Sequence, residues 1–266
     1  MITVCILTKN AQETINATLE SVRLFSEVLI LDNGSTDATL EIAKQYSNVK
    51  TYETKFCGFG PLRNQIAAMA RNDWILALDS DEVLSESLIH EILHIQLNQS
   101  LAYAIPRHNF YQGKRIRGCG WSPDYVARLY HRKQTRYFDL EVHESLETKN
   151  VQKLTAPLFH TPYRTTFDFL AKMQHYSTLF AQQYQGKKSS SFQKAILHAA
   201  FTFFRSYILK RGFLDGSEGF VISLYNANST FYKYMKLKEL NGLLKAPVQQ
   251  SPHSEQEKQK TPSPSR

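Results

Sequence analysis

The chain has 266 residues, is 42% hydrophobic and carries a formal net charge of +8 at pH 7. These values are ordinary for a globular protein with a sizeable core, and the positive charge favours an anionic partner: nucleic acid, an acidic membrane leaflet or a phosphorylated substrate. Three widely spaced cysteines and an N-terminus with no basic segment exclude a disulfide framework and a signal peptide, so we expect a cytosolic protein.

Strand-like and helix-like segments alternate in the first part of the chain. Residues 2–8 and 28–32 are apolar, β-rich runs, and apolar positions between them have helical spacing. Asp37 is among the cap-type residues of a following short helix, and a third strand is expected near residues 49–52.

A fourth strand is predicted over residues 74–79. It is preceded by a helix that begins near Pro61 and followed by a helix that Ser85 caps. Strands that alternate with helices predict an α/β fold, with a mainly parallel sheet and helices on both faces, over roughly the first hundred residues.

The tract of residues 107–136 is basic, with eight lysines and arginines and a single acidic residue, Asp124. Guanidinium groups suit phosphates and acidic sugars, so we interpret this tract as a surface that binds an acceptor. Attachment of the tract to a membrane and an ordinary solvated charged surface are the alternatives.

A helical, aromatic-rich region is predicted beyond Pro162 from apolar positions at helical spacing. Its stretch 195–209 is apolar but too short to span a bilayer, and His198 and Arg205 interrupt it. The flanking lysines and arginines suit an interfacial helix on an anionic leaflet, with packing on the catalytic domain as the alternative.

Two acidic clusters that follow apolar strands indicate the ligand site, because ligands of open α/β sheets bind at the carboxyl ends of strands. Asp79 and Asp81, in the segment LDSDE, can share a divalent cation, and Mg²⁺ or Mn²⁺ suits such oxygen ligands. Asp32 ends the second strand before an Asn-Gly turn, and we expect it to contact a base or ribose. For Asp37 we prefer the role of helix cap.

Four segments in order, ILTKN, DNGSTD, CGFGPLRN and LDSDE, resemble the family 2 glycosyltransferases, which are inverting enzymes with the GT-A fold. The second half resembles a narrower group, the bacterial lipopolysaccharide inner-core transferases. The segments that carry this second resemblance are WSPDYVARLYHR, EVHESL and KRGFLDGSEG.

The resemblance implies a nucleotide-sugar donor and a divalent metal. The implied contacts are the base and ribose for Thr8, Asn10 and Asp32, the nucleotide for Arg63 and Asn64, and the ribose and metal for Asp79 and Asp81.

Inverting transfer also needs a base on the acceptor hydroxyl, and a carboxylate within hydrogen-bond reach contributes about 10² to 10⁴-fold. The family usually places a carboxylate after the metal motif, so Glu144 in EVHESL is the candidate base. Many members carry an acidic pair there, whereas this chain has His143 before Glu144. The choice therefore stays open among Glu144, Glu141, Asp139 and Asp124.

We predict a GT-A catalytic domain over residues 1–160, a membrane-associating helical extension over 161–244 and a disordered tail over 245–266. The predicted reaction is metal-dependent, inverting transfer of a hexose, from a UDP-sugar to an anionic glycolipid, the lipopolysaccharide core. It would take place at the cytoplasmic face of the inner membrane.

Two alternatives remain. Within enzymes, a polyprenyl phosphate could replace the glycolipid as acceptor. A basic nucleic-acid-binding protein is the alternative of another class, which the local character of the charge and the missing RNP signature disfavour. The segment GFGPLR lacks the third glycine of GxGxxG and no GxxxxGK[ST] sequence occurs, which excludes a dinucleotide fingerprint and a P-loop.

Overall fold

The structure is a computed structural model that describes residues 1–140 and 144–244. Its strands are β1 (Ile2–Thr8), β2 (Val28–Asp32), β3 (Val49–Glu53), β4 (Trp74–Asp79), β5 (Glu82–Leu84), β6 (Ala102–Tyr111), β7 (Lys114–Arg115), β8 (Tyr125–His131), β9 (Val151–Lys153) and β10 (Leu158–Tyr163). Its helices are α1 (Ile15–Ser21), α2 (Thr39–Ala43), α3 (Phe59–Met69), α4 (Glu86–His94), α5 (Thr166–Tyr184), α6 (Phe192–Phe204) and α7 (Gly216–Leu243), with a π-helical turn η1 (Arg205–Leu209) and a 3-10 turn η2 (Gly212–Asp215).

The strands form one sheet in the order β3-β2-β1-β4-β8-β6-β10-β5. The first four are mutually parallel, so the carboxyl ends of β1, β2 and β4 meet at one edge: Thr8 is in register with Asp32, and Leu7 with Asp79. Strand β8 runs antiparallel to β4 and β6, and β10 pairs with β5 in antiparallel register. The predicted parallel sheet is therefore confirmed for its first half, and the second half is mixed.

Both faces of the parallel half are covered by helices, as predicted. Alternate residues of a strand point to opposite faces, and in β1 Val4 and Ile6 join the cluster that includes α1, α2 and α4. Cys5 and Leu7 join the cluster on the other face, which includes Leu62 of α3. This continuous burial explains why the strands read as unbroken apolar runs.

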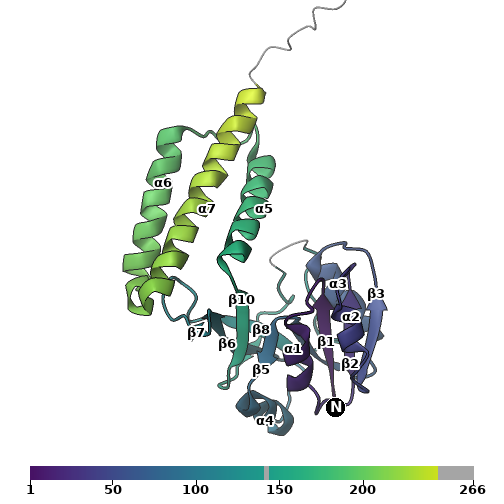
Figure 1. Cartoon of the computed structure of the whole chain (residues 1–266). Helices are drawn as coiled ribbons and strands as arrows, with labels where there is room; N and C mark the ends of the chain where they lie inside the picture. The colour runs from purple at the N-terminus through teal and green to yellow at the C-terminus, as the bar shows by residue number, and fades with distance from the viewer. Residues whose placement is uncertain (141–143, 245–266) are drawn as a thin grey trace, which may run out of the picture.

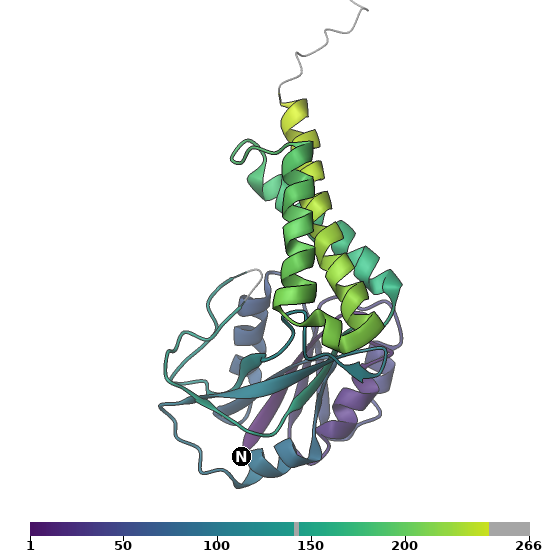
Figure 2. The same ribbon diagram turned by 90° about the vertical axis from the view of Figure 1, so that its left-hand side faces the viewer.

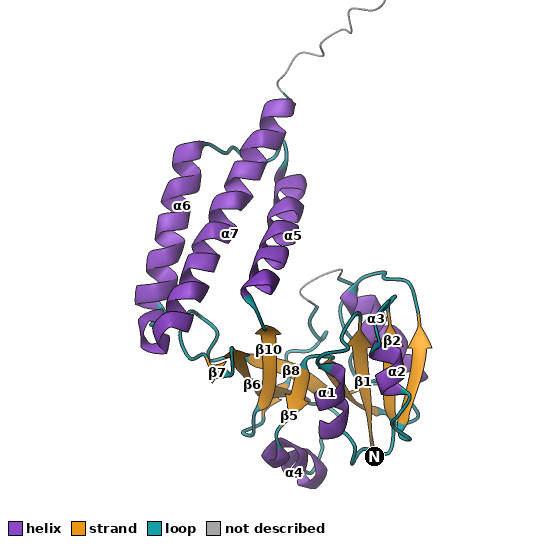
Figure 3. Cartoon of the chain, in the orientation of Figure 1, coloured by secondary structure: helices purple, strands orange, loops and turns teal. Residues whose placement is uncertain are grey.

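The helices α5, α6 and α7 form an extension that rises away from the sheet, with α7 in the middle (Figures 1 and 3). An aromatic cluster attaches the extension: Phe169 of α5 stacks on Tyr163 of β10 at 4.1 Å and also contacts Tyr111 of β6. At the foot of α7, a Cβ on Gly219 would lie 1.8 Å from the carbonyl oxygen of Gly212. Only glycine allows α7 and η2 to approach so closely.

The expected boundary at residue 160 falls inside β10, so the sheet region ends at Tyr163 and the extension begins with α5 at Thr166. The helix expected over 195–209 begins earlier, at Phe192, and its last five residues form the π-helical turn η1. The expected disordered tail, 245–266, lies outside the described residues.

Candidate functional site

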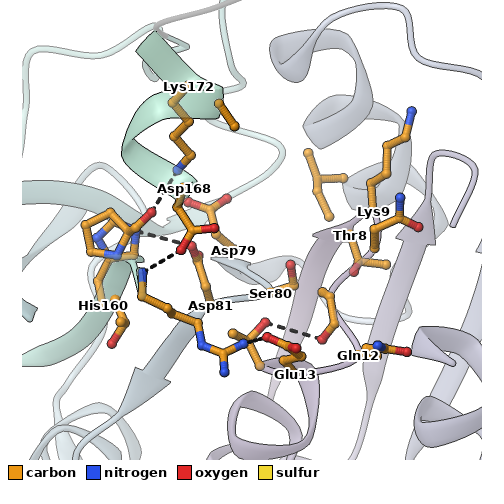
Figure 4. Close-up of a pocket in the computed structure, with 18 of the residues that line it drawn as sticks. Thr8, Lys9, Gln12, Glu13, Asp79, Ser80, Asp81, His160, Asp168 and Lys172 are labelled. Carbon is orange, nitrogen blue, oxygen red and sulfur yellow. Dashed lines mark hydrogen bonds and ion pairs between the residues drawn. The ribbon is translucent and has the colours of Figure 1, made fainter. Parts of the chain in front are cut away.

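A cleft of ≈ 1100 Å³ lies at the carboxyl ends of β1 and β4. One wall consists of the residues after these strands and the start of α1, and the opposite wall consists of β10 and the first turns of α5 (Figure 4). Of the predicted site residues, Thr8, Asn10, Asp79, Asp81 and Glu144 line the cleft. The volume is large enough for a nucleotide-sized ligand.

Two side-chain oxygens on the strand wall are buried and have no hydrogen-bond partner within residues 1–140 and 144–244: Oγ1 of Thr8 and Oδ1 of Asn33. Both residues line the cleft, and the main chains pair there, since the Asn33 N–H donates to the Thr8 carbonyl oxygen at 3.0 Å. A buried polar atom without a partner is costly, so these two atoms are suited to bind a ligand that supplies the missing hydrogen bonds.

The carboxylate of Asp32 is used by its own turn. It accepts hydrogen bonds from the backbone N–H groups of Gly34 (3.0 Å) and Ser35 (2.8 Å) and from the Ser35 hydroxyl (2.5 Å). Asp32 is 1% exposed and does not line the cleft, whereas the next residue, Asn33, does. The contact of Asp32 with a base or ribose stays a prediction; the geometry favours Asn33 for this contact.

The neighbouring polar residues also fix this turn. Asn10 accepts a hydrogen bond from the Thr36 N–H at 2.8 Å, and Asp37 accepts hydrogen bonds from the N–H and the hydroxyl of Thr39, the first residue of α2. The structure places the N-cap of α2 at Ala38, one residue after the preferred cap Asp37, which instead contacts the first residue of the helix. Asp37 also lines the cleft and accepts from the Gln12 N–H at 3.1 Å.

Asp79 is bound by two arginines. Arg63 donates to its Oδ1 and Arg128 to its Oδ2, each at 2.5 Å, and both arginines are buried. Burial by itself would raise the pKa of Asp79, but the guanidinium groups of Arg128 and Arg63 outweigh burial and hold this pKa well below its usual range. With both oxygens engaged, Asp79 is a poorer metal ligand than Asp81, and its assignment to the metal stays a prediction.

Asp81 faces a residue that the sequence did not single out, His160 of β10. The His160 Nε2 atom lies 3.5 Å from Oδ2 of Asp81, across the cleft wall (Figure 4). On the other side of the ring, Nδ1 lies 2.6 Å from Oδ1 of Asn109. The Asn109 amide nitrogen already donates to the Trp121 carbonyl oxygen and to Asp124, so its oxygen is the acceptor and Nδ1 of His160 carries the proton.

This tautomer leaves Nε2 of His160 with a lone pair that points at a carboxylate oxygen of Asp81. The two atoms repel each other unless a second proton or a cation lies between them. A metal-ligating histidine usually donates its other N–H to an acceptor, as His160 does to Asn109. The donor set therefore fits a divalent cation held by one carboxylate and one imidazole.

The charges of the surrounding network also fit such a cation. Five carboxylates and three guanidinium groups form one network of ion pairs and hydrogen bonds, which Asp81 joins through His160 and Asn109. The formal charges of these eight groups sum to −2. The members are Asp79, Asp81, Glu82, Asp124, Glu144, Arg63, Arg107 and Arg128. Within residues 1–140 and 144–244 no three His, Cys, Asp or Glu side chains gather as a metal cluster, so phosphate oxygens or water would complete the coordination.

Glu144 is the candidate base that the cleft favours. Its Oε1 accepts a hydrogen bond from Nε of Arg63 at 3.2 Å, and it lines the cleft. Asp139 is exposed outside the cleft, and Asp124 is bound by Arg107 at 2.8 Å. Glu141 and His143 lie outside the described residues.

Asn64 does not line the cleft. Its side chain accepts a hydrogen bond from the N–H of Tyr137 and donates to the carbonyl oxygen of the same residue, both at 2.9 Å. It thereby fixes the segment that leads toward Glu144. The nucleotide contacts expected of Asn64 and of the buried Arg63 stay predictions.

The wall formed by α5 carries aromatic and cationic side chains. Phe167 is 75% exposed at the cleft, and Phe56 on the opposite side is 50% exposed. Arg164 forms an ion pair with Glu13 of the strand wall, and Lys172 donates to the Pro162 carbonyl oxygen at 2.9 Å.

None of the eight cations of the basic tract lines the cleft, in contrast to the interpretation of this tract as the acceptor surface. Six of them form ion pairs within the protein, because strand β8 and its neighbours place them opposite carboxylates. They are Arg107, Lys114, Arg128, Arg132, Lys133 and Arg136.

Comparison with known proteins gives a consistent result. The family profile described as "Glycosyl transferase family 2" matches residues 3–149. An uncharacterized glycosyltransferase of Rickettsia typhi is 29% identical over 253 residues, which cover 89% of this chain and 86% of the relative. The lipopolysaccharide core biosynthesis glycosyltransferase LpsC of Rhizobium meliloti is 25% identical over 91% of this chain and 93% of that protein. Among solved structures, residues 1–349 of S. aureus TarS in complex with UDP-GlcNAc align with a TM-score of 0.45 and 15% identity, covering 92% of this chain and 91% of that one.

Proposed function

We propose, from the premise that this chain belongs to glycosyl transferase family 2, that it transfers a hexose with inversion from a UDP-sugar to a lipopolysaccharide core acceptor. The chain is a glycosyltransferase with the GT-A class of α/β fold and a helical extension. The observation that carries the proposal is the Asp81–His160 pair in a cleft that is also lined by Thr8 and Asn33, whose buried side-chain oxygens have no hydrogen-bond partner among the described residues.

Each wall of the cleft would bind a different part of the donor. Thr8 and Asn33 would accept hydrogen bonds from the base or ribose, because no described residue pairs with their side-chain oxygens. Asp81 and His160 would hold Mg²⁺ or Mn²⁺ beside the diphosphate. When bound, the cation neutralises negative charge on the departing nucleoside diphosphate.

Glu144 would take the proton of the acceptor hydroxyl. Arg63 supports this role, since its Nε contact orients the Glu144 carboxylate while its Nη2 atom binds Asp79. Glu144 thereby acts as the general base, and its substitution by glutamine removes the proton acceptor but keeps the shape of the side chain.

The acceptor would approach from the α5 wall. Exposed aromatic rings such as Phe167 and Phe56 suit contact with sugar rings, and Arg164, Lys172 and Lys9 supply positive charge for an anionic glycolipid. The likeness to LpsC supports a lipopolysaccharide core as acceptor. A polyprenyl phosphate remains the alternative, whereas the family membership favours an enzyme over a nucleic-acid-binding protein.

With a glycolipid acceptor, the transfer reaction would take place at the cytoplasmic face of the inner membrane. Among the helices that the structure describes, none combines the length and the apolar character required to cross a bilayer. Attachment would therefore be peripheral in this proposal.

A thermal-shift screen of UDP-, GDP- and CMP-sugars, with and without Mn²⁺, tests the donor, because a ligand that binds only the native state raises the melting temperature. We expect stabilisation by a UDP-sugar that increases with Mn²⁺, and loss of the Mn²⁺ effect in Asp81→Ala. Transfer to lipopolysaccharide core, compared with transfer to polyprenyl phosphate, then tests the acceptor. Stabilisation by none of the three sugars would refute the proposal.

A further inference from the structure

Helix α6 and the turn η1 present an apolar face that no described element covers. Leu197, Phe201, Phe204 and Ile208 recur at i, i+4, i+7 and i+11, and all four are exposed, Leu197 by 69%. Ala195 is the one buried residue of α6, because the helix packs mainly against α7. Figure 2 shows α6 in front of α7, on the outside of the extension.

The apolar face continues beyond the helix. Leu209 is 60% exposed, and Leu214 in η2 is 66% exposed, so large apolar side chains extend to the foot of the extension. A contiguous exposed patch of this kind marks an interaction site rather than ordinary scattered surface residues.

The exposed charge of this face has one sign, because Asp215, the last residue of η2, is buried. Residues 185–214 contain six lysines and arginines and no aspartate or glutamate. The six are Lys187, Lys188, Lys194, Arg205, Lys210 and Arg211. In the part of the chain that the structure describes, none of them takes part in an ion pair.

This charge pattern decides between partners. Pairing with a second copy of the chain would bring two uncompensated positive faces together, which repulsion opposes. A surface with negative charge above an apolar layer matches both properties, and an anionic lipid leaflet is such a surface.

A shallow groove of ≈ 520 Å³ on the same face has the corresponding composition. Leu197 and Phe201 supply its apolar part, and Lys194 and His198 lie beside them. An apolar floor with a cation at its edge suits the junction between a lipid headgroup and its acyl chain.

We propose that the face formed by α6, η1 and η2 binds an anionic phospholipid leaflet, with the α6 axis parallel to the membrane plane. The apolar residues enter the headgroup boundary, and the cations at both ends of α6 bind lipid phosphates. The proposal goes beyond the catalytic one, because no residue of this face lines the cleft. It is consistent with a membrane-bound acceptor but does not depend on the identity of the sugar.

Co-sedimentation of the full chain with lipid vesicles tests this proposal. We expect binding to phosphatidylethanolamine vesicles that contain phosphatidylglycerol and little binding to phosphatidylcholine alone. The double variant Leu197→Gln/Phe201→Gln should bind more than about tenfold more weakly, because two apolar side chains no longer enter the lipid. The double variant Lys187→Gln/Arg205→Gln should bind the anionic vesicles about 25-fold more weakly, at roughly fivefold for each cation.

Matched controls separate this face from general surface properties. Leu24→Gln/Leu93→Gln removes two exposed apolar residues from the sheet region, and Lys44→Gln/Lys50→Gln removes two exposed cations there. Both controls should bind vesicles like the wild type. Equal binding by all variants, or wild-type binding to phosphatidylcholine that matches the anionic vesicles, would overturn the proposal.

Two further measurements keep the outcomes distinct. Sedimentation velocity without lipid reports whether the face instead joins two copies, and a dimer that Leu197→Gln/Phe201→Gln dissociates would also overturn the proposal. Calorimetric binding of a UDP-sugar to the same variants should be unchanged. If neither the wild type nor any variant bound the UDP-sugar, the proposed function would be refuted, whereas the proposal of a lipid-binding face would still be judged by the vesicle experiment.

Discussion

Replacement of Arg128 by methionine tests the charged network beneath the cleft. Arg128 is 5% exposed, and its Nη2 atom donates to Asp79 at 2.5 Å and to Glu82 at 2.7 Å. Methionine fills part of the space but leaves two carboxylates with one arginine each, Arg63 for Asp79 and Arg107 for Glu82.

The magnitude follows from two opposing effects. Removal of one partner of a buried ion pair costs about 3–5 kcal/mol. Arg128 also has a buried Nε–H without a partner, and its removal returns about 1 kcal/mol. We therefore expect the free energy of unfolding to fall by about 3 kcal/mol at pH 7.

The pH dependence gives a second test. The pKa of Asp79 is lowered in the folded state by Arg128 and Arg63 against the effect of burial, so its stabilisation is present above the unfolded pKa of about 3.9 and is lost as the pH falls toward the folded value. Without Arg128 this lowering is smaller. The difference between wild type and variant should therefore narrow as the pH is reduced below about 5.

Equilibrium urea unfolding at pH 7 and about pH 4 measures both quantities. Arg136→Met is the matched control, because Arg136 is 61% exposed and pairs with Glu147 at the surface, where an ion pair contributes at most about 1 kcal/mol. An Arg128→Met variant no less stable than this control, or a difference that widens in acid, would refute the reasoning.

Other substitutions test the cleft and the thiols. Glu144→Gln should keep donor binding but lower turnover by about 10² to 10⁴-fold in a transfer assay, and full activity would assign the base elsewhere. Thr8→Val should weaken nucleotide binding by roughly 0.5–1.5 kcal/mol in calorimetry without loss of stability, since the Thr8 hydroxyl has no protein partner. Gly60→Ala should lower transfer activity, because its Cβ would meet the Phe138 carbonyl oxygen at 2.0 Å and displace the segment that leads to Glu144; wild-type activity would contradict this packing. Native thiol labelling should modify the exposed Cys57 and spare Cys5, whose pKa burial raises to about 12; equal labelling of both would contradict this.

The parallel half of the fold could be predicted because its signals are local. Strands β1, β2 and β4 are buried on both faces, so they are continuous apolar runs, and Asp32 and Asp79 are the last residues of β2 and β4. The same locality identified Asp81, which lies just after a strand and lines the cleft. The helix spacing of α5 was equally visible.

The rest of the site depends on pairings between distant segments. His160 reaches Asp81 because β10 pairs with β5 in antiparallel register, with His160 opposite Glu82. The sequence around His160 contains no pattern that predicts this pairing. Arg128 reaches Asp79 because β8 runs beside β4. A basic tract in a sequence does not reveal which cations face carboxylates, and six of the eight form ion pairs within the protein.

The most direct test of the central claim is the linkage between Mn²⁺ and UDP binding, measured by calorimetry on the wild type, Asp81→Asn and His160→Ala. If Asp81 and His160 hold a cation beside the diphosphate, Mn²⁺ will tighten UDP binding to the wild type, and either substitution will abolish this increase while the fold persists. The account would be contradicted if Mn²⁺ tightened UDP binding equally in the wild type and both variants. It would also be contradicted if the affinity of the wild type for UDP were the same with and without Mn²⁺.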